Sequence, residues 1–317
     1  MSRILITRSM PERVVAAARE LGEVTYRDET KPMARDGMVA ALGDFDGILT
    51  TLGDGWSAEV FEAAGAARCK LLANFGVGFN HIDVEAARKA GVVVTNTPGT
   101  VTDGTADLAL TLILMTARRA GEGERLVRAG AWGGWHPVQM LGLHVTGKRL
   151  GVIGMGRIGQ AIARRCHFGF GMEIGYVARS DKTLDYPATR HESLGALASA
   201  SDIVVTAVPG GAETHHMVGT PVFEAMPDHG IFVNIARGDV VDEAALIAAL
   251  EARRIAGAGL DVYEFEPEVP EALRALENVV LLPHLGTAAL EVREAMGLMA
   301  VDNLRAVLAG EVAPNSV

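Results

Sequence analysis

Short apolar runs alternate with segments in which apolar residues recur every three or four positions, and this alternation continues along most of the chain. The runs predict β-strands and the periodic segments predict helices. In the first third of the chain the expected strands lie at 3–7, 46–50, 71–75 and 92–95, and the expected helices at 12–21, 58–66 and 84–90. Strands that alternate with helices are typical of βαβ units and a parallel sheet.

A second series of the same kind follows one long helix, which is expected over residues 103–129. Its strands are expected at 150–154, 173–177, 203–208, 231–235, 257–260 and 279–282, and its helices after residue 157, near 221–226 and over 243–252. A closing helix is expected at 288–308 and is free to return to the first series. The pattern therefore predicts an α/β protein with two doubly wound parallel-sheet domains, of the Rossmann or flavodoxin-like kind.

Charge and cysteine content narrow the classes of protein that the chain can belong to. The 317 residues carry 29 Lys and Arg against 39 Asp and Glu, a net charge of −10, without a long basic cluster. Binding to nucleic acid or to a membrane surface is therefore not expected. The two cysteines, Cys69 and Cys166, suit a reducing cytoplasm and cannot form a thiolate metal site. We expect a cytoplasmic protein, because the apolar stretches are also too short to span a bilayer.

The glycine motif GMGRIG at residues 154–159 stands between an expected strand and an expected helix. In such a motif Gly154 makes the tight turn, Gly156 lets the backbone approach a diphosphate, and Gly159 lets the helix pack closely on the strand. The alternative is a tight βα turn without a ligand. The position of the motif at the head of a strand series favours a dinucleotide site.

The end of the second strand in this series bears on the choice between NAD and NADP. NAD commonly meets an Asp or Glu about 20 residues past the glycines. Here the sequence reads Arg179-Ser180, and the first carboxylate is Asp181. An arginine beside a hydroxyl suits a 2′-phosphate. We therefore expect NADP(H) as the cofactor, with NAD(H) as the alternative if Arg179 is only a solvated surface residue.

Three other expected strand ends carry ionisable side chains, in the segments NIARG, DVYEFEP and LPHLG. Ligands of open α/β sheets bind at such ends. An arginine, a glutamate and a histidine at these ends suit the reduction of a 2-keto acid. That reaction needs a cation for the substrate carboxylate, a proton donor for the carbonyl, and a group that keeps the donor protonated.

Several motifs, in the same order, resemble the D-isomer-specific 2-hydroxyacid dehydrogenase family over nearly the whole chain. They are NFGVGFNHIDVEAARKAGVVVTNTPG, TADLALTLIL, LGVIGMGRIGQAIARR, NIARGDVVDEAALIAAL, AGAGLDVYEFEP and LLPHLGTA. The segment AWGGWHPVQMLG and the arginine after the second strand are most similar to the glyoxylate/hydroxypyruvate reductase branch. The resemblance implies a homodimeric enzyme that reduces a small 2-keto acid, glyoxylate or hydroxypyruvate, to the D-2-hydroxy acid with NADPH. It also implies a substrate-binding domain of residues 1–99 and 286–317, a dinucleotide-binding domain of residues 100–285, and an active-site cleft between them.

The resemblance assigns roles to the matching positions. Arg237 would bind the substrate carboxylate and keto oxygen, and His284 would protonate the keto oxygen. Glu266, which directly precedes Pro267, would orient His284 and keep it protonated, in preference to the nearby Glu264. Further substrate contacts are implied for Leu52, Val77, Gly78 and, across a dimer, Trp135. Cofactor contacts are implied for the glycine motif and Arg179-Ser180, and for Thr105, Arg157, Ile158, Val208, Pro209, Thr214, Ile235, Ala236, Asp261 and Gly286.

Two other functions stay open at this point. One is an NAD-dependent dehydrogenase of a larger D-2-hydroxy acid, with Arg179 idle. The other is a non-enzymatic, nucleotide-sensing corepressor of the same fold. The segment VPGGAET at 208–214 also departs from the family, which usually has a bulkier residue and a Thr-Pro pair there.

Some residues have simpler interpretations. His215-His216 is interpreted as a solvated turn, and no metal is expected. Asp103 and Asp107 are expected to charge the first turn of the long helix. Trp132, like Trp135, would in the simpler interpretation pack a hairpin in the core.

Overall fold

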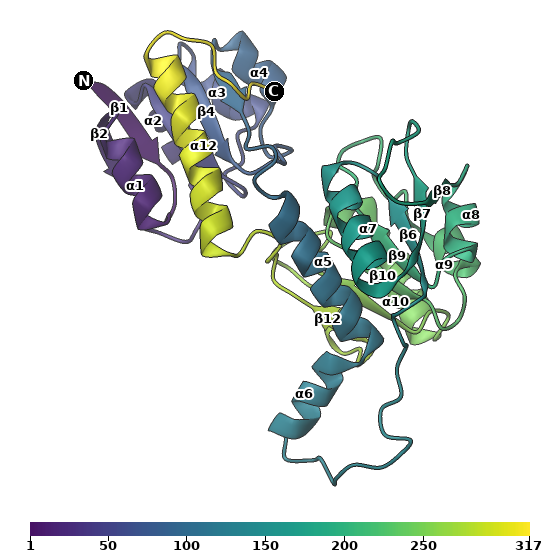
Figure 1. Cartoon of the computed structure of the whole chain (residues 1–317). Helices are drawn as coiled ribbons and strands as arrows, with labels where there is room; N and C mark the ends of the chain where they lie inside the picture. The colour runs from purple at the N-terminus through teal and green to yellow at the C-terminus, as the bar shows by residue number, and fades with distance from the viewer. The chain divides into compact units, whose positions relative to one another are not determined.

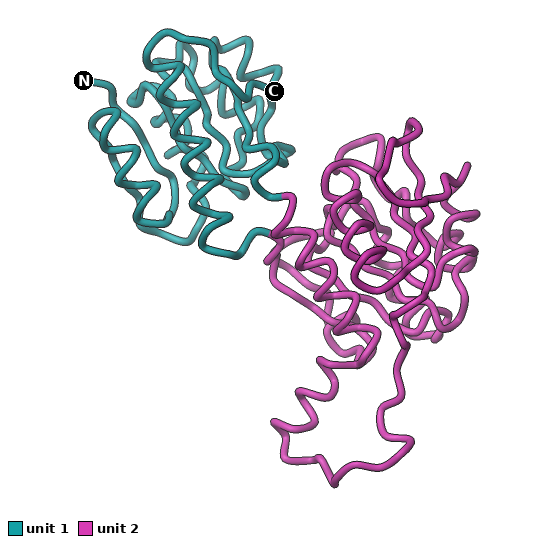
Figure 2. The backbone as a smooth tube through the Cα atoms, viewed as in Figure 1, with its two compact units in different colours: residues 1–101, 287–317 teal, residues 102–286 magenta.

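Two parallel β-sheets organise the chain (Figure 1). The computed structural model describes residues 1–317 and divides them into two units (Figure 2). Unit 1 contains residues 1–101 and 287–317, drawn in teal, and unit 2 contains residues 102–286, drawn in magenta. The boundaries expected from the sequence were 99/100 and 285/286. The chain leaves unit 1, completes unit 2 and returns, so both termini belong to unit 1.

The sheet of unit 1 has the strand order β2-β1-β3-β4-β5, and every neighbouring pair is parallel. Its strands are β1 (Ser2–Ile6), β2 (Gly22–Tyr26), β3 (Gly47–Thr51), β4 (Leu71–Phe75) and β5 (Val93–Thr95). Its helices are α1 (Glu12–Arg19), α2 (Arg35–Asp44), α3 (Ala58–Ala64), α4 (Val84–Lys89) and the closing α12 (Leu290–Leu308). Ile4 and Ile6 enter the apolar cluster under α1 and α12, whereas Leu5 enters the cluster under α2, α3 and α4. This alternation is the period of two that a strand covered on both faces requires.

The sheet of unit 2 has the order β12-β11-β10-β9-β6-β7-β8, again with parallel pairs throughout. Its strands are β6 (Arg149–Ile153), β7 (Glu173–Val177), β8 (Ala188–Arg190), β9 (Ile203–Thr206), β10 (Ile231–Asn234), β11 (Gly257–Leu260) and β12 (Val279–Leu281). Its helices are α5 (Thr102–Ala117), α6 (Ala120–Arg128), α7 (Arg157–Phe170), α8 (Leu194–Ser199), α9 (Thr220–Ala225), α10 (Glu243–Glu251) and α11 (Glu271–Arg274). One apolar cluster joins the sheet to α5 and α7, and a second joins it to α8, α9 and α10. The strand order reverses between β6 and β9, and ligands of doubly wound sheets bind at the carboxyl ends beside such a reversal.

The prediction of one long helix over residues 103–129 is wrong, because the chain forms two helices there. Arg119 adopts a left-handed backbone conformation, with φ 52°, directly before α6. The carbonyl of Ala117 accepts the N–H of Leu143 at 2.7 Å instead of continuing the helical ladder. A bond to a residue so far along the chain ends α5, and local sequence pattern does not reveal it.

Two strands were not expected from the sequence, β2 and β8, and both lie at sheet edges. Half or more of their residues are exposed or only partly buried, so neither shows a continuous apolar run. The other strands lie within one or two residues of their expected positions. No helix of the structure combines the length and the apolarity needed to cross a membrane.

Asp103 and Asp107 do more than charge the first turns of α5. Both bind Arg165 of α7, with Nη2 2.8 Å from Asp103 and Nε 2.7 Å from Asp107. The shared guanidinium therefore joins the two helices that cover one face of the unit 2 sheet.

Candidate active site

The glycine turn after β6 leaves the N-terminus of α7 open. Gly154 has φ +98°, and a Cβ there would lie 2.6 Å from the carbonyl oxygen of Ala207, so only glycine fits. A Cβ on Gly159 would lie 2.1 Å from the oxygen of Gly154, which lets α7 approach the strand. No side chain caps α7, and the space beside Gly156 is empty within 4 Å. Uncapped N–H groups at the positive end of a 14-residue helix suit the diphosphate of a dinucleotide.

Other residues expected to contact the cofactor follow the carboxyl ends of the neighbouring strands. Val208 and Pro209 come after β9, and Ile235 and Ala236 come after β10. Because β6, β9 and β10 are adjacent parallel strands, these segments lie with the glycine turn at the carboxyl ends of the sheet. Thr214 closes the loop after β9, since its hydroxyl donates to the carbonyl of Pro209 at 2.7 Å.

Asp261, at the end of β11, is almost fully buried. Its carboxylate accepts the N–H groups of Leu285 and Gly286 at 2.6 and 2.8 Å. Burial raises the pKa of Asp261 above its ordinary value, although these two hydrogen bonds oppose the shift. A Cβ on Gly286 would lie 3.4 Å from Asp261 Oδ2 and 3.5 Å from Thr105 Oγ1, so these three residues come together.

Arg179, just beyond β7, is exposed but forms an ion pair. Its Nη2 lies 2.7 Å from a carboxylate oxygen of Glu213, in the loop after β9. The two side chains remain 83% and 80% exposed. Ser180 accepts a hydrogen bond from Lys182 Nζ at 3.2 Å. Arg157, at the start of α7, is also exposed, and Ile158 is half-buried.

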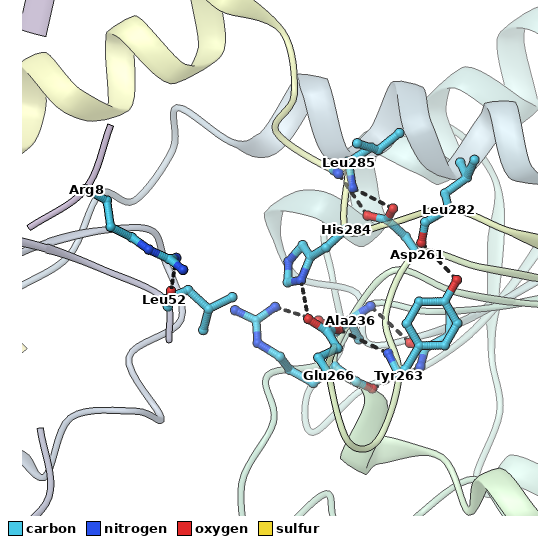
Figure 3. A network of polar contacts seen from close by, with 12 residues as sticks. Arg8, Leu52, Ala236, Asp261, Tyr263, Glu266, Leu282, His284 and Leu285 are labelled. Carbon is cyan, nitrogen blue, oxygen red and sulfur yellow. Dashed lines mark hydrogen bonds and ion pairs between the residues drawn. The ribbon is translucent and has the colours of Figure 1, made fainter. Parts of the chain in front are cut away.

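His284 and Glu266 form a hydrogen-bonded pair (Figure 3). His284 Nδ1 lies 2.8 Å from Glu266 Oε2, and the other carboxylate oxygen accepts the N–H of Tyr263 at 3.1 Å. His284 has a left-handed backbone, with φ 55°, and its N–H donates to the carbonyl of Asp261 at 3.0 Å. The pairing through Nδ1 leaves Nε2 as the ring nitrogen that can exchange a proton with a ligand.

The charges around this pair act on Glu266 in opposite directions. Burial raises the pKa of Glu266, but the hydrogen bond and charge of His284, the Tyr263 N–H and the charge of Arg237 outweigh it, so the pKa lies below its ordinary value. Burial lowers the pKa of Arg237 against the charges of Glu266 and Asp239. An arginine nevertheless stays charged at neutral pH, so unit 2 offers an anionic ligand a fixed cation and an imidazole–carboxylate pair.

The sequence motifs of this site match a known family. The sequence model of the D-isomer specific 2-hydroxyacid dehydrogenase, NAD binding domain, matches residues 110–286. The glyoxylate reductase of Thermococcus onnurineus is 44% identical over 326 aligned positions, which cover 99% of this chain and 95% of the relative. The chain belongs to the D-isomer specific 2-hydroxyacid dehydrogenase family. Unit 2 contains the NAD binding domain of this oxidoreductase.

Other members of the family support the same placement. The glycerate dehydrogenase of Hyphomicrobium methylovorum is 38% identical over 97% of this chain and 96% of its own. A solved NADPH-dependent glyoxylate/hydroxypyruvate reductase from Sinorhizobium meliloti, in complex with NADP and malonate, has a TM-score of 0.87 and 37% identity. That likeness covers all of this chain and 96% of the other. The comparisons place the dehydrogenase in the glyoxylate reductase branch.

The expected substrate contacts Leu52, Val77 and Gly78 lie in unit 1, in the loops after β3 and β4. The carbonyl of Leu52 accepts a hydrogen bond from Arg8 Nη1 at 2.8 Å (Figure 3). In the second loop, Asn74 Nδ2 donates to the carbonyl of Gly78 at 2.9 Å, and Asn96 Nδ2 donates to that of Val77 at 3.0 Å. Side-chain amides therefore fix the backbone of this loop, which was expected to contact the substrate.

Asn234 was not expected to take part in the site, but it forms hydrogen bonds with the segment that carries Arg237. Asn234 is buried, and its Oδ1 accepts the hydroxyl of Thr206 at 2.6 Å and the N–H of Ala236 at 3.0 Å. Its Nδ2 donates to the carbonyl of Arg237 at 2.9 Å. A polar amide inside an apolar strand end was the signal that could have identified it, since buried amides need several partners.

Two other expectations concern residues away from the pair. Trp132 and Trp135 are 53% and 79% exposed, so the interpretation that they pack a hairpin in the core is wrong. His215 and His216 are exposed and stack on each other, and His216 Nε2 lies 2.7 Å from Glu264. Glu264 is therefore engaged with His216, whereas Glu266 contacts His284.

Proposed function

We propose that this dehydrogenase reduces glyoxylate and hydroxypyruvate to the corresponding 2-hydroxy acids with NADPH. The observation that carries the proposal is the His284–Glu266 pair at 2.8 Å, with Arg237 close enough to lower the pKa of Glu266. This set lies in the same unit as the open N-terminus of α7. Relatives named glyoxylate reductase, and a similar structure named as an NADPH-dependent glyoxylate/hydroxypyruvate reductase, favour these two substrates.

Each of the three side chains has a separate task in this reaction. Arg237 binds the substrate carboxylate, because its planar guanidinium can donate two parallel hydrogen bonds. His284 gives the proton on Nε2 to the keto oxygen as the carbonyl electron pair moves onto that oxygen. Glu266 holds Nδ1–H and favours the charged imidazole. When bound, the nicotinamide supplies the hydride that forms the new C–H bond at C2 of the substrate.

The cofactor residues follow from the open turn and the strand ends. We assign the diphosphate to Gly154, Gly156, Arg157 and Ile158 at the head of α7. We assign a 2′-phosphate to Arg179 and Ser180, because the segment after β7 offers a cation and a hydroxyl before its first carboxylate. Asp261 with its two backbone donors is assigned to the nicotinamide end, together with Thr105 and Gly286. In unit 1 we assign Leu52, Val77 and Gly78 to the substrate.

We also infer that the protein acts as a homodimer through the arm, defined as α6 and residues 129–141. The arm projects from the rest of unit 2 (Figure 1), and α6 has no buried residue. Large apolar side chains along it are more than half exposed, and they are Val127, Trp132, Trp135, Val138 and Leu141. Contiguous exposed apolar side chains mark a surface that another protein covers. In this assembly Trp135 contacts the substrate of the partner subunit.

The decrease in nicotinamide absorbance tests the proposal, with NADPH or NADH against glyoxylate, hydroxypyruvate, pyruvate and phenylpyruvate. We expect the highest kcat/KM with NADPH and the two smaller acids, glyoxylate and hydroxypyruvate. A clear preference for NADH would contradict the role of Arg179. A preference for phenylpyruvate would contradict the substrate assignment and favour a dehydrogenase of larger 2-hydroxy acids.

A further inference from the structure

Hydrogen bonds at the neighbouring Thr214 hold the loop that carries Glu213. The Thr214 N–H donates to the carbonyl of Gly211 at 3.0 Å, and the Thr214 hydroxyl reaches the carbonyl of Pro209 at 2.7 Å. The same loop packs against the catalytic region, since a Cβ on Gly210 would lie 2.9 Å from Arg237 Cγ. The backbone beside Glu213 is therefore held at the strand ends, where the cofactor is assigned.

The two guanidinium groups of this turn, those of Arg179 and Arg190, are already in ion pairs. Arg190 binds Asp181 at 2.9 Å and donates to the carbonyls of Ala178 and Arg179, so it is occupied with the backbone of this turn. Lys182 contacts Ser180. The ion pair of Arg179 is with Glu213, at 2.7 Å. The carboxylate thus occupies a guanidinium donor that a 2′-phosphate needs.

We propose that Glu213 is a specificity-determining residue that weakens the preference of the cofactor site for a 2′-phosphate. This inference rests on the assignment of Arg179 to that phosphate. A bound 2′-phosphate must either displace the Glu213 carboxylate or lie beside a like charge, and both cost binding energy. The uncharged 2′-hydroxyl of NADH leaves the ion pair intact. Glu213 therefore reduces the difference in affinity between NADPH and NADH and lets the enzyme also use NADH.

The expected size of the effect follows from the exposure of the pair. Both side chains are more than three-quarters exposed, so water and salt screen the interaction. Exposed ion pairs change equilibria only modestly, which corresponds here to roughly a 2- to 5-fold change in a dissociation constant. The change should shrink further as ionic strength rises.

The test is the dissociation constant of NADPH and of NADH, measured by nicotinamide fluorescence for the wild type, Glu213→Gln and Asp181→Asn. Asp181→Asn is the matched control, because it also removes one exposed carboxylate near Arg179 in sequence, but one that binds Arg190. We expect Glu213→Gln to tighten NADPH roughly 2- to 5-fold relative to NADH at low salt, and the gain to fall at high salt. An unchanged ratio of the two constants, or the same change in Asp181→Asn, would overturn the proposal.

Arg179→Ala and the double variant separate this inference from the cofactor assignment. If Arg179→Ala weakens NADPH and NADH equally, the assignment of Arg179 to the phosphate is wrong. If it weakens NADPH selectively while Glu213→Gln changes nothing, only the role of Glu213 is wrong. Because Glu213 acts through the guanidinium, Glu213→Gln should add little in the Arg179→Ala background. If Glu213→Gln tightened NADPH in the Arg179→Ala background as much as in the wild type, that mechanism would be contradicted.

Discussion

At the scale of single residues, His284 owes its position to backbone hydrogen bonds as much as to its side chain. Asp261 accepts the His284 N–H through its carbonyl, and its carboxylate accepts the next two N–H groups. These bonds hold His284 in a left-handed conformation that is uncommon for a non-glycine residue. With the backbone fixed in this way, the imidazole meets Glu266 through Nδ1.

Glu266→Gln tests the charge of this pair. Burial raises the pKa of Glu266, but the hydrogen bond and charge of His284 lower it further. The carboxylate therefore stays ionised as the pH falls until that lowered pKa is reached. Glutamine keeps an acceptor but loses the charge that favours imidazolium. We expect kcat for keto-acid reduction to fall roughly 10- to 100-fold. As the pH is raised, the variant should lose activity at a lower pH than the wild type does.

The matched control for that variant is Glu264→Gln, because Glu264 contacts His216. Its pH–rate profile should resemble that of the wild type. The same profile in Glu266→Gln as in the wild type would contradict an electrostatic role for Glu266.

At the scale of elements, Asp202 joins three neighbouring strands of unit 2. It precedes β9, and its carboxylate accepts Nε and Nη2 of Arg149 at the start of β6 at 3.1 and 2.7 Å. His229, before β10, lies 2.8 Å from the same carboxylate. The hydrogen bonds from Arg149 hold the pKa of Asp202 well below its usual range. This network fixes the amino ends of strands whose carboxyl ends carry the residues that we propose for cofactor binding.

Asp202→Asn should lower the free energy of unfolding of unit 2 by about 2 kcal/mol at neutral pH, since hydrogen bonds to a mostly buried charge are lost. Because the folded-state pKa is lowered, the contribution is complete above the unfolded-state pKa of about 4, and it is lost as the pH falls from there through the folded-state pKa. Denaturant titrations at several pH values should therefore show the two proteins converging in acid.

Asp228→Asn is the control for this comparison, since Asp228 is 90% exposed beside the same histidine. It should unfold like the wild type at every pH. A difference between Asp202→Asn and the wild type that stays constant into acid would contradict the account of the ion pair.

The sequence predicted more at the element scale than at the residue scale, for physical reasons. Apolar runs marked the central strands because those strands are covered on both faces, whereas the edge strands β2 and β8 have no such run. The ordered motifs predicted Arg237, Glu266 and His284. They did not predict the Asn234 bonds, the Arg179–Glu213 ion pair or the end of α5, because each depends on residues brought together only by the fold.

At the scale of the whole molecule, the arm is the feature that a single chain does not explain. Its large apolar side chains face solvent, although such a surface normally becomes covered. The proposed homodimer would cover this surface, because a twofold axis places the same apolar patch of each subunit against the other.

Substituting Trp135 and Leu141 with serine should shift the protein from dimer to monomer in sedimentation experiments at micromolar concentration. Apolar burial drives such association, and serine removes it. Val312→Ser is the control, because Val312 is 89% exposed in unit 1, outside the arm. A monomeric wild type, or a double variant that stays fully dimeric, would contradict the role of the arm.

The central claim is that His284 protonates a 2-keto acid as this enzyme reduces it. The most direct measurement compares the wild type and His284→Ala for NADPH oxidation in the presence of glyoxylate, alongside NADPH binding by fluorescence. We predict a loss of kcat of roughly 100- to 10,000-fold with NADPH affinity largely intact. Undiminished turnover of glyoxylate by His284→Ala would contradict the account.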